Sequence, residues 1–476
     1  MTIGESEVAG TARGAETGAA SSSPIQSAED SGVGSPSSVS LKQLAIRASM
    51  WTVIGFGVSQ LLRLGGNLAL TRLLSPGVFG VMALVNAVLQ GLQMFSDFGT
   101  RQSVIQHRRG DDPDFVNTAW TFQAVRGGAL WLTACALAAP LSLVYPGTGI
   151  GWLLPAAGLT AAIAGLASTK EVTLNRHLNI GRVSMVEIVA QCLGLAVMIV
   201  WAWRAPSVWA LIGGAIVGVG VRSALTHVVL PGAWNRFCGE WSAVRDLVDF
   251  GKWLLLASVI GFLSEQGDRL LLGKIMSSTE LGVYSVAFFL AEFVSQAVSR
   301  LTHVVLFPAF SRLAREAPER LRAGYYRSRF AIDMVCAPAG GFLVGAGPLV
   351  VRLLYDWRYA EAGAMVQALA LRTLFTCATT PGAGALLALG QPRYATIAKV
   401  MTAVWIMTGI PLGFWLGGLS GAVWAVGLAY ALPAGYFVRA LKKHGLIEWR
   451  GELRTVVMFC GGVAVGLFAA AICFGD

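Results

Sequence analysis

The sequence predicts an all-α integral membrane protein with about 12–14 transmembrane helices, arranged as two six-helix bundles in a parallel pseudo-two-fold repeat. The 476 residues are 55% hydrophobic and only 13% charged, whereas soluble domains carry about 25% charged residues. Apolar stretches of roughly 20 residues, each long enough to cross a hydrocarbon core of about 30 Å, follow one another almost to the end of the chain. A short polar turn also recurs at a matching place in each half of the sequence.

Thirteen apolar spans follow one another along the chain, separated by short polar connections. No soluble domain interrupts them, because the longest connections on the predicted outer side have about ten residues. The spans are residues 49–71, 78–99, 117–140, 150–170, 183–203, 207–230, 251–273, 281–307, 328–351, 362–388, 397–416, 420–439 and 454–474.

The repeated turn lies between two spans in each half. Residues 72–81 (RLLSPGVFGV) and 274–283 (KIMSSTELGV) align without a gap at an offset of 202 residues, with an identical serine, glycine and valine. A turn repeated at this interval predicts a duplicated bundle. Because the first and seventh spans begin on the same side, the axis that relates the halves is expected to lie along the membrane normal.

These patterns divide the chain into four parts. Residues 1–40 are rich in Ser, Gly, Ala and Pro and predict a disordered cytoplasmic tail. Residues 41–245 form the first six-helix bundle and residues 246–445 the second. The remaining segment, 446–476, predicts an extra C-terminal transmembrane helix without a counterpart in the first half.

Lysines and arginines are distributed unequally between the two predicted sides. The loops and ends assigned to the inside hold 24 of them and the outer loops hold five, as the positive-inside rule describes. This places the N-terminus in the cytoplasm. The net charge of +10 is then explained by orientation and by contact with anionic membrane lipids, with a specific cytoplasmic partner as the alternative; nucleic acid is not expected.

Charged and amide side chains nonetheless lie within the spans. A charge near the bilayer centre costs about 2.5 kcal/mol or more, so these groups should face protein or water. On the first, second, seventh and eighth spans they lie on one helix face, and we expect the four polar stripes to face a shared central cavity. The candidates for its substrate-binding wall are Arg63, Asn67, Gln90, Gln93, Arg126, Glu265, Asp268, Arg269, Glu292, Gln296 and Arg300.

A competing interpretation is that these groups form buried pairs that hold the bundle together. Asp268 and Arg269 are adjacent near the outer end of their span and would suit a structural pair or an outer gate. Arg63 and Arg126 favour the cavity, because their spans contain no obvious acidic partner at similar depth. Three acids near the inner ends of their spans are instead expected to pair with basic groups: Asp97, Glu187 and Asp333.

Motifs of enzyme chemistry are missing from the sequence. There is no GxxxxGK[ST] phosphate loop, no HExxH and no other metal-ligand spacing. The seven cysteines are scattered without a CxxC pair and are expected to be packing residues. We therefore expect a protein that is not an enzyme and that uses no cofactor and no metal.

Two segments resemble a known family. Residues 67–106 contain the turn LLSPGVFG and the helix end FSDFG, and residues 268–293 contain DRLLLGK followed by LGVYS. In this order they resemble the polysaccharide transporter branch of the multidrug/oligosaccharidyl-lipid/polysaccharide flippase superfamily. The resemblance covers about residues 45–440, and members typically have twelve to fourteen spans in two bundles.

The resemblance implies a function. Members are similar to flippases that turn undecaprenyl-pyrophosphate-linked oligosaccharides across the bacterial inner membrane for surface polysaccharide, lipopolysaccharide O-antigen or exopolysaccharide synthesis. It implies that Arg63 and Arg126, with Arg269, replace the hydration of the pyrophosphate. The sugars would meet the Asn/Gln face of the second span, and Glu265 or Glu292 would bind a coupling cation or proton. The polymerase and the chain-length or export proteins of the pathway are the implied partners.

Three alternatives remain open. A drug/cation antiporter of the same superfamily would favour a predominantly acidic cavity. A polyprenyl-dependent sugar polymerase or ligase would need a sizeable outer loop with catalytic side chains. A non-transporting membrane component of a polysaccharide assembly machine is opposed only by the charges within the spans.

Overall fold

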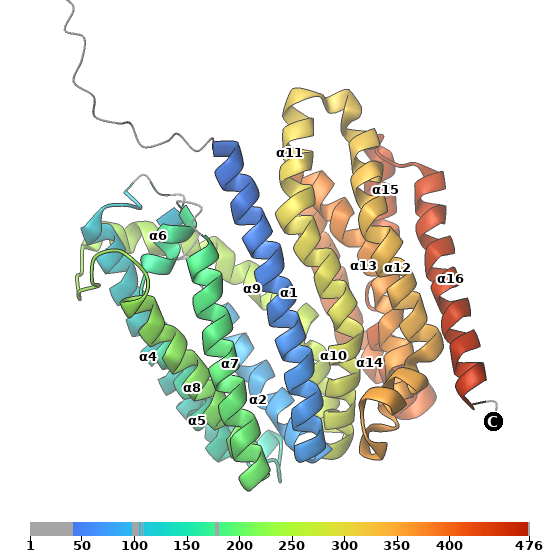
Figure 1. The fold of residues 1–476 in the computed structure, drawn as a ribbon, viewed down its shortest axis with the longest axis horizontal. Coiled ribbons are helices and arrows are strands. Elements are labelled where there is room, and N and C mark those ends of the chain that lie inside the picture. The colour runs from blue at the N-terminus through green and yellow to red at the C-terminus, as the bar shows by residue number, and fades with distance from the viewer. Residues whose placement is uncertain (1–40, 98–103, 106, 108, 177–179, 475–476) are drawn as a thin grey trace, which may run out of the picture.

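The computed structural model describes residues 41–97, 104–105, 107, 109–176 and 180–474. The tail predicted at residues 1–40 lies outside the described residues. Within the described ranges the chain forms helices and no strand (Figure 1). The helices are α1 (Leu41–Leu73), α2 (Pro76–Phe95), α4 (Pro113–Val144), α5 (Ile150–Gly165), α6 (Lys170–Arg176), α7 (Ile180–Arg204), α8 (Val208–Val228), α9 (Trp241–Ile275), α10 (Ser278–Leu301), α11 (Phe307–Glu316), α12 (Leu321–Leu354), α13 (Ala362–Ala388), α14 (Arg393–Gly427), α15 (Ala431–Lys443) and α16 (Trp449–Phe474).

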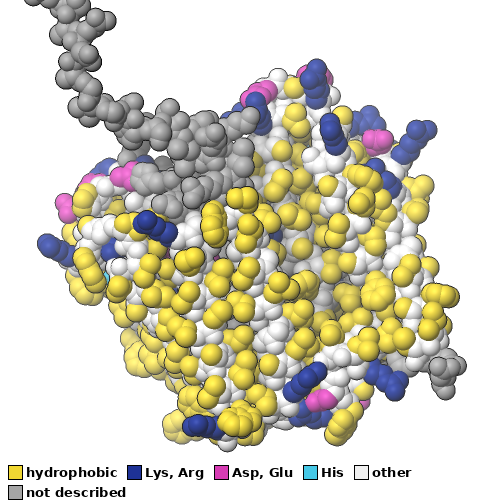
Figure 2. All heavy atoms as spheres, viewed as in Figure 1, with side chains coloured by type: hydrophobic (Ala, Val, Ile, Leu, Met, Phe, Trp, Pro, Cys, Tyr) yellow, Lys and Arg dark blue, Asp and Glu magenta, His cyan; other side chains and the backbone are white. Residues whose placement is uncertain are grey.

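Large apolar side chains cover the outside of the bundle. Leu143, Trp152 and Trp415 are 84%, 82% and 79% exposed, which suits contact with lipid chains rather than water. Figure 2 shows such side chains across the middle of one face, with charged groups toward its two ends. Among the described residues, nine helices are long and apolar enough to cross a membrane, or ten if the bent pair α5 and α6 counts as one span. The protein is therefore a multi-pass membrane protein, and the number of thirteen spans stays a prediction.

Helix α14 consists of two antiparallel segments. Gly417 and Gly418 interrupt it, and Gly418 has a φ of +60°, a conformation that favours glycine. The Nε1 of Trp405 donates to the carbonyl oxygen of Ala425 at 2.8 Å, although a straight helix would separate these residues by about 30 Å. The turn therefore joins two of the spans that the sequence predicts.

The helices form two groups (Figure 1). The N-terminal group consists of α1, α2 and α4–α8, and the C-terminal group consists of α9–α16. Between the groups, α2 packs against α9 and α10, and α4 contacts α9. The division into two six-helix bundles at residues 41–245 and 246–445, and the parallel repeat that relates them, stay predictions.

The repeated turns lie where α2 and α10 cross. Both helices begin after an extended serine, Ser75 with ψ 153° and Ser277 with ψ 161°. A Cβ atom at Gly80 would lie 1.9 Å from the carbonyl oxygen of Ser278, and one at Gly282 would lie 1.8 Å from that of Pro76. The two contacts are equivalent under the sequence offset, so the glycine shared by both copies permits the close approach of the two groups.

The bundle has two ends that differ in charge. We call the end at which α1 begins the basic end, because α11 and the start of α12 lie there with a row of arginines (Figure 1). The opposite end contains the turns at Ser75 and Ser277, and we call it the turn end. The row at the basic end comprises Arg312, Arg315, Arg320, Arg322 and Arg327.

The C-terminal helix α16 packs along α12. A Cβ atom at Gly341 would lie 2.0 Å from the carbonyl oxygen of Phe459, so small residues bring the two backbones together. At the basic end of this contact, the buried Arg329 pairs with Asp333 at 3.0 Å and with Glu452 of α16. The predicted pairing of Asp333 with a basic group is confirmed.

Candidate functional site

A cavity of about 660 Å³ lies between the two groups of helices, and we call it the central cavity. Helices α1, α2, α9 and α10 form most of its wall, and residues of α5, α7 and α8 complete it. Its polar lining residues are Arg63, Asn67, Asn86, Gln90, Gln93, Thr160, Gln266, Arg269, Ser285, Glu292 and Gln296.

Helical spacing explains why these side chains meet. Arg63 and Asn67 are four residues apart on α1, and Gln266 and Arg269 are three residues apart on α9, so each pair lies on one helix face. Helices α2 and α10 each contribute a similar row. The structure thus brings polar stripes from four helices to one cavity, which lies between the two groups.

Two arginines in the central cavity lack an acidic partner. Arg63 of α1 donates from Nη1 to Oε1 of Gln60 at 3.3 Å. Arg269 of α9 donates to Gln266 and lies over the ring of Phe288, with Cζ 4.5 Å from the ring centroid. Neither guanidinium has a carboxylate within 4.0 Å in the part of the chain that the structure describes. One uncompensated cation therefore comes from each group of helices.

The carboxylate in the central cavity is compensated. Glu292 of α10 forms an ion pair of 3.2 Å with Arg372 of α13. Arg372 also donates to the hydroxyl of Tyr430 at 2.8 Å, and its Cζ lies 4.4 Å from the centroid of that ring. Arg372, which does not line the cavity, neutralises the charge of Glu292. Arg63 and Arg269 therefore leave the wall of the cavity with a net positive charge.

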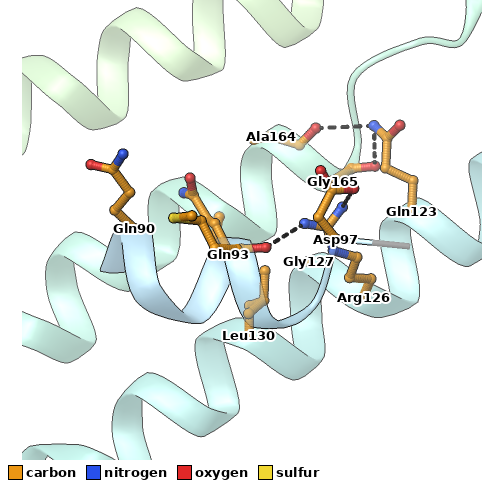
Figure 3. Close-up of a pocket in the computed structure, with 11 residues that line it drawn as sticks. Gln90, Gln93, Asp97, Gln123, Arg126, Gly127, Leu130, Ala164 and Gly165 are labelled. Carbon is orange, nitrogen blue, oxygen red and sulfur yellow. Dashed lines mark hydrogen bonds and ion pairs between the residues drawn. The ribbon is translucent and has the colours of Figure 1, made fainter. Parts of the chain in front are cut away.

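A second cavity of about 390 Å³ adjoins the central cavity, and we call it the side chamber. It lies within the N-terminal group, between α2, α4 and α5, and it shares Gln90 and Gln93 with the central cavity (Figure 3). Its other lining residues are Met94, Asp97, Gln123, Arg126, Gly127, Leu130, Ala161, Ala164 and Gly165.

Arg126 corrects one sequence-based expectation. It lines the side chamber, and Asp97 lies 3.8 Å from it, so the expectation that it lacks an acidic partner is wrong. Arg126 also donates at 3.0 Å to Ser96 Oγ and at 3.0 Å to the carbonyl oxygen of Gln93. These groups are at the C-terminal end of α2, where a cation satisfies free carbonyl groups and the helix dipole.

Three further candidates do not line either cavity. Glu265 pairs with Lys399 at 3.2 Å. Asp268 is 4% exposed and accepts a hydrogen bond from the hydroxyl of Tyr284. Arg300 lies over the ring of Phe56 at 5.8 Å. These placements differ from the expected cavity wall, because each of the three side chains is directed to a partner on a neighbouring helix.

The connection between α12 and α13 contacts the last turns of α1 at the turn end. Tyr355 donates from its hydroxyl to Oδ1 of Asn67 at 2.7 Å. Arg358 donates to the carbonyl oxygens of Thr71 at 3.0 Å and of Arg72 at 3.1 Å, at the end of α1. We call this group of contacts the latch, because it fastens the C-terminal group to the N-terminal group.

Sequence reasoning did not place several of these groups at the site. Gln266 was missed because Glu265 beside it is charged, although its spacing of three residues from Arg269 was a usable signal. Tyr355 lies in the connection after α12 and Arg358 in the short 3-10 helix Trp357–Tyr359, and neither gave a periodic signal. Among the described residues, no three His, Cys, Asp or Glu side chains gather in an arrangement that would hold a metal ion.

The sequence matches a known family model and curated proteins. The model described as "Polysaccharide biosynthesis protein" matches residues 69–364. The lipopolysaccharide biosynthesis protein WzxC of Escherichia coli (strain K12) is 21% identical over 81% of this chain and 77% of its own length. The succinoglycan biosynthesis transport protein ExoT of Rhizobium meliloti (strain 1021) is 22% identical over 65% of this chain and 63% of its own length.

Solved structures share the fold. The lipid II flippase MurJ in an inward closed conformation superimposes with a TM-score of 0.68 at 10% identity, over 90% of this chain and 99% of that protein. An inward-facing multidrug resistance MATE family transporter of the MOP superfamily gives a TM-score of 0.63 at 13% identity, over 86% of this chain and 98% of that protein. The likeness shows that the chain shares the fold of these membrane proteins.

Proposed function

The chain belongs to the family of polysaccharide biosynthesis proteins, and from this membership we propose that it is a flippase for lipid-linked oligosaccharides. It moves undecaprenyl-pyrophosphate-linked units from the inner to the outer leaflet of the bacterial inner membrane, for surface or exopolysaccharide synthesis. The names of its relatives and the fold that it shares with a lipid flippase support a lipid-linked oligosaccharide as the cargo.

The pair of uncompensated arginines in the central cavity carries the proposal. A pyrophosphate must lose water when it enters the cavity, and guanidinium groups replace that hydration with charge-assisted, bidentate hydrogen bonds. Arg63 and Arg269 come from different groups of helices, so a bound pyrophosphate would bridge the two groups. The pair suited to this task is therefore Arg63 and Arg269, since Arg126 is bonded to the end of α2.

Alternating access provides the movement. The latch and the close contact at Gly80 fasten the turn end, so we infer that the cargo enters from the basic end, which faces the cytoplasm together with the N-terminus. The halves at 41–245 and 246–445 then rock about the central cavity. Opening of the turn end would release the headgroup on the outer side.

The polyprenyl tail remains in the membrane during this movement. Helix α1 packs along α7 rather than along α10, and side chains bridge the seam between α1 and α10. Gln60 donates to Gln296 at 3.2 Å, and Arg300 lies over Phe56. Parting of these two contacts would let the tail pass beside the bundle while the headgroup occupies the cavity.

A drug/cation antiporter is the second candidate in the same fold. A cationic drug would need carboxylates that face the cavity, whereas Glu292 is paired with Arg372 and Glu265 lies outside the cavity. The charge of the cavity therefore favours an anionic cargo. Because neither acid is free in the cavity, we propose no coupling ion.

The proposal is tested in the native host with Arg63→Ala and Arg269→Ala, and with Arg204→Ala as the control, an exposed arginine at the end of α7 that lines neither cavity. At equal protein levels, we expect the two cavity variants to lose surface polysaccharide and to accumulate lipid-linked repeat units in the inner leaflet. In the control, the amounts of surface polysaccharide and of lipid-linked repeat units should equal those found with the unmodified protein. Loss of polymer without accumulation of the precursor would contradict a flippase.

A further inference from the structure

The side chamber differs from the central cavity in its charge. The central cavity holds Arg63 and Arg269 without acidic partners. In the side chamber, the cation Arg126 lies 3.8 Å from Asp97, and the remaining polar groups are neutral glutamines. The chamber is therefore unsuited to a second phosphate, and its polar groups favour a neutral ligand rich in hydroxyl groups.

Two polar side chains of the chamber, Arg126 and Gln123, are held in position by hydrogen bonds (Figure 3). Arg126 is bonded to the end of α2 through Ser96 and the Gln93 carbonyl. The amide nitrogen of Gln123 donates to the carbonyl oxygens of Ala164 and Gly165, each at 3.3 Å, at the end of α5. Groups that are already oriented lose little entropy when they bind a ligand.

One amide in the shared wall is free. Gln93 is exposed, and its side chain makes no hydrogen bond to another described residue. An amide presents both a donor and an acceptor, as does a sugar hydroxyl. Because Gln93 lines both cavities, a ligand that passes from the central cavity into the chamber would meet this amide at the boundary.

Small residues line the chamber where α4 and α5 pack closely together. Gly127 of α4 and Gly165 of α5 lie at their crossing, and a Cβ atom at Gly127 would lie 2.7 Å from the carbonyl oxygen of Ala161. Ala161 and Ala164 complete this wall. The volume of the chamber, about 390 Å³, falls within the range of roughly 300–1,000 Å³ that is typical of small-molecule sites.

We propose that the side chamber binds the sugar residues next to the pyrophosphate of the cargo. The pyrophosphate then lies between Arg63 and Arg269, and the sugars extend past Gln93 into the space between α2, α4 and α5. This inference rests on the proposed function. It adds that the N-terminal group recognises the carbohydrate part, separately from the anion.

The test fills the chamber and compares two cargoes. Ala164→Phe places a ring in the chamber, and Ala129→Phe places the same ring on the exposed surface of α4 as a control. The purified proteins are reconstituted in liposomes, and the flipping of undecaprenyl diphosphate is compared with that of undecaprenyl diphosphate carrying the oligosaccharide repeat unit of the host. We expect Ala164→Phe to slow the sugar-bearing lipid by about tenfold or more, equivalent to about one lost hydrogen bond, and to leave the sugar-free lipid unchanged.

A second variant covers the case in which Ala164→Phe fails to fold. Gln93→Met removes the amide at similar length, and it should produce the same selective loss for the sugar-bearing lipid. If a folded variant changes the flipping rates of both lipids by the same factor relative to the unmodified protein, the sugar site is overturned. The proposal that the protein is a flippase would still stand. Failure of the unmodified protein to flip either lipid would instead overturn the proposed function, and the sugar site with it.

Discussion

The hydroxyl of Tyr355 donates a hydrogen bond of 2.7 Å to Oδ1 of Asn67, and this bond joins the latch to the wall of the central cavity. Asn67 lines the cavity, so a cargo that bonds to its amide competes with Tyr355. Occupancy of the cavity and closure of the turn end are thereby connected through one side chain.

Tyr355→Phe should loosen the turn end. One hydrogen bond is worth about 1 kcal/mol, so its loss should raise the population open at the turn end by about fivefold. The measurement is the labelling rate of a single cysteine at Ala83, a residue of the cavity wall, by a membrane-impermeant maleimide added at the turn end. Trp357→Phe in the same connection is the control, because Trp357 is 85% exposed, and equal labelling in both variants would refute the latch.

Gly80→Ala should prevent the close contact between α2 and α10. Its Cβ atom would overlap the carbonyl oxygen of Ser278, so the helices must separate and the state closed at the turn end should be lost. Gly77→Ala is a matched control three residues away, since its Cβ atom would meet only Thr279 Oγ1, at 3.6 Å. Cross-linking of a cysteine pair introduced at Pro76 and Ser278 reports the contact; undiminished cross-linking in Gly80→Ala would argue against this crossing.

Arg372→Met should destabilise the protein by leaving Glu292 unpaired. Breaking a buried pair costs about 3–5 kcal/mol, and the partial exposure of this pair to the cavity, 16% and 21%, places the expected loss at the lower end. The melting temperature in detergent measures it. The double variant Arg372→Met with Glu292→Gln should recover most of the loss, and a double variant as unstable as the single one would show that the ion pair is not the cause.

The position of the cavity could be predicted from the sequence because helical periodicity is a local property. Steps of three and four residues place Arg63 with Asn67, and Gln90 with Gln93, on single helix faces. A polar face on a membrane helix must turn away from lipid. The repeated turn predicted a duplicated bundle; that its shared glycine permits the approach of α2 and α10 is seen only in the structure.

The partners of each charge could not be predicted, because they depend on how the helices cross. Asp268 and Arg269 are neighbours in sequence, but successive side chains on a helix point about 100° apart. Asp268 therefore meets Tyr284 in the protein interior while Arg269 faces the cavity. The ion pair of Arg372 with Glu292 joins residues of two helices 80 positions apart, and the sequence carried no signal for it.

The most direct test of the central claim is the rate at which purified Arg63→Ala and Arg269→Ala flip undecaprenyl diphosphate in liposomes, compared with the rate of Arg204→Ala, whose exposed side chain lines neither cavity. Loss of a charge-assisted hydrogen bond of about 1.5–3 kcal/mol should slow each cavity variant by roughly 10- to 100-fold. Arg63→Lys should retain part of the rate, because an ammonium keeps the charge but not the bidentate geometry. We expect Arg204→Ala to flip at the unmodified rate; equal rates in all three alanine variants would contradict anion binding by the two cavity arginines.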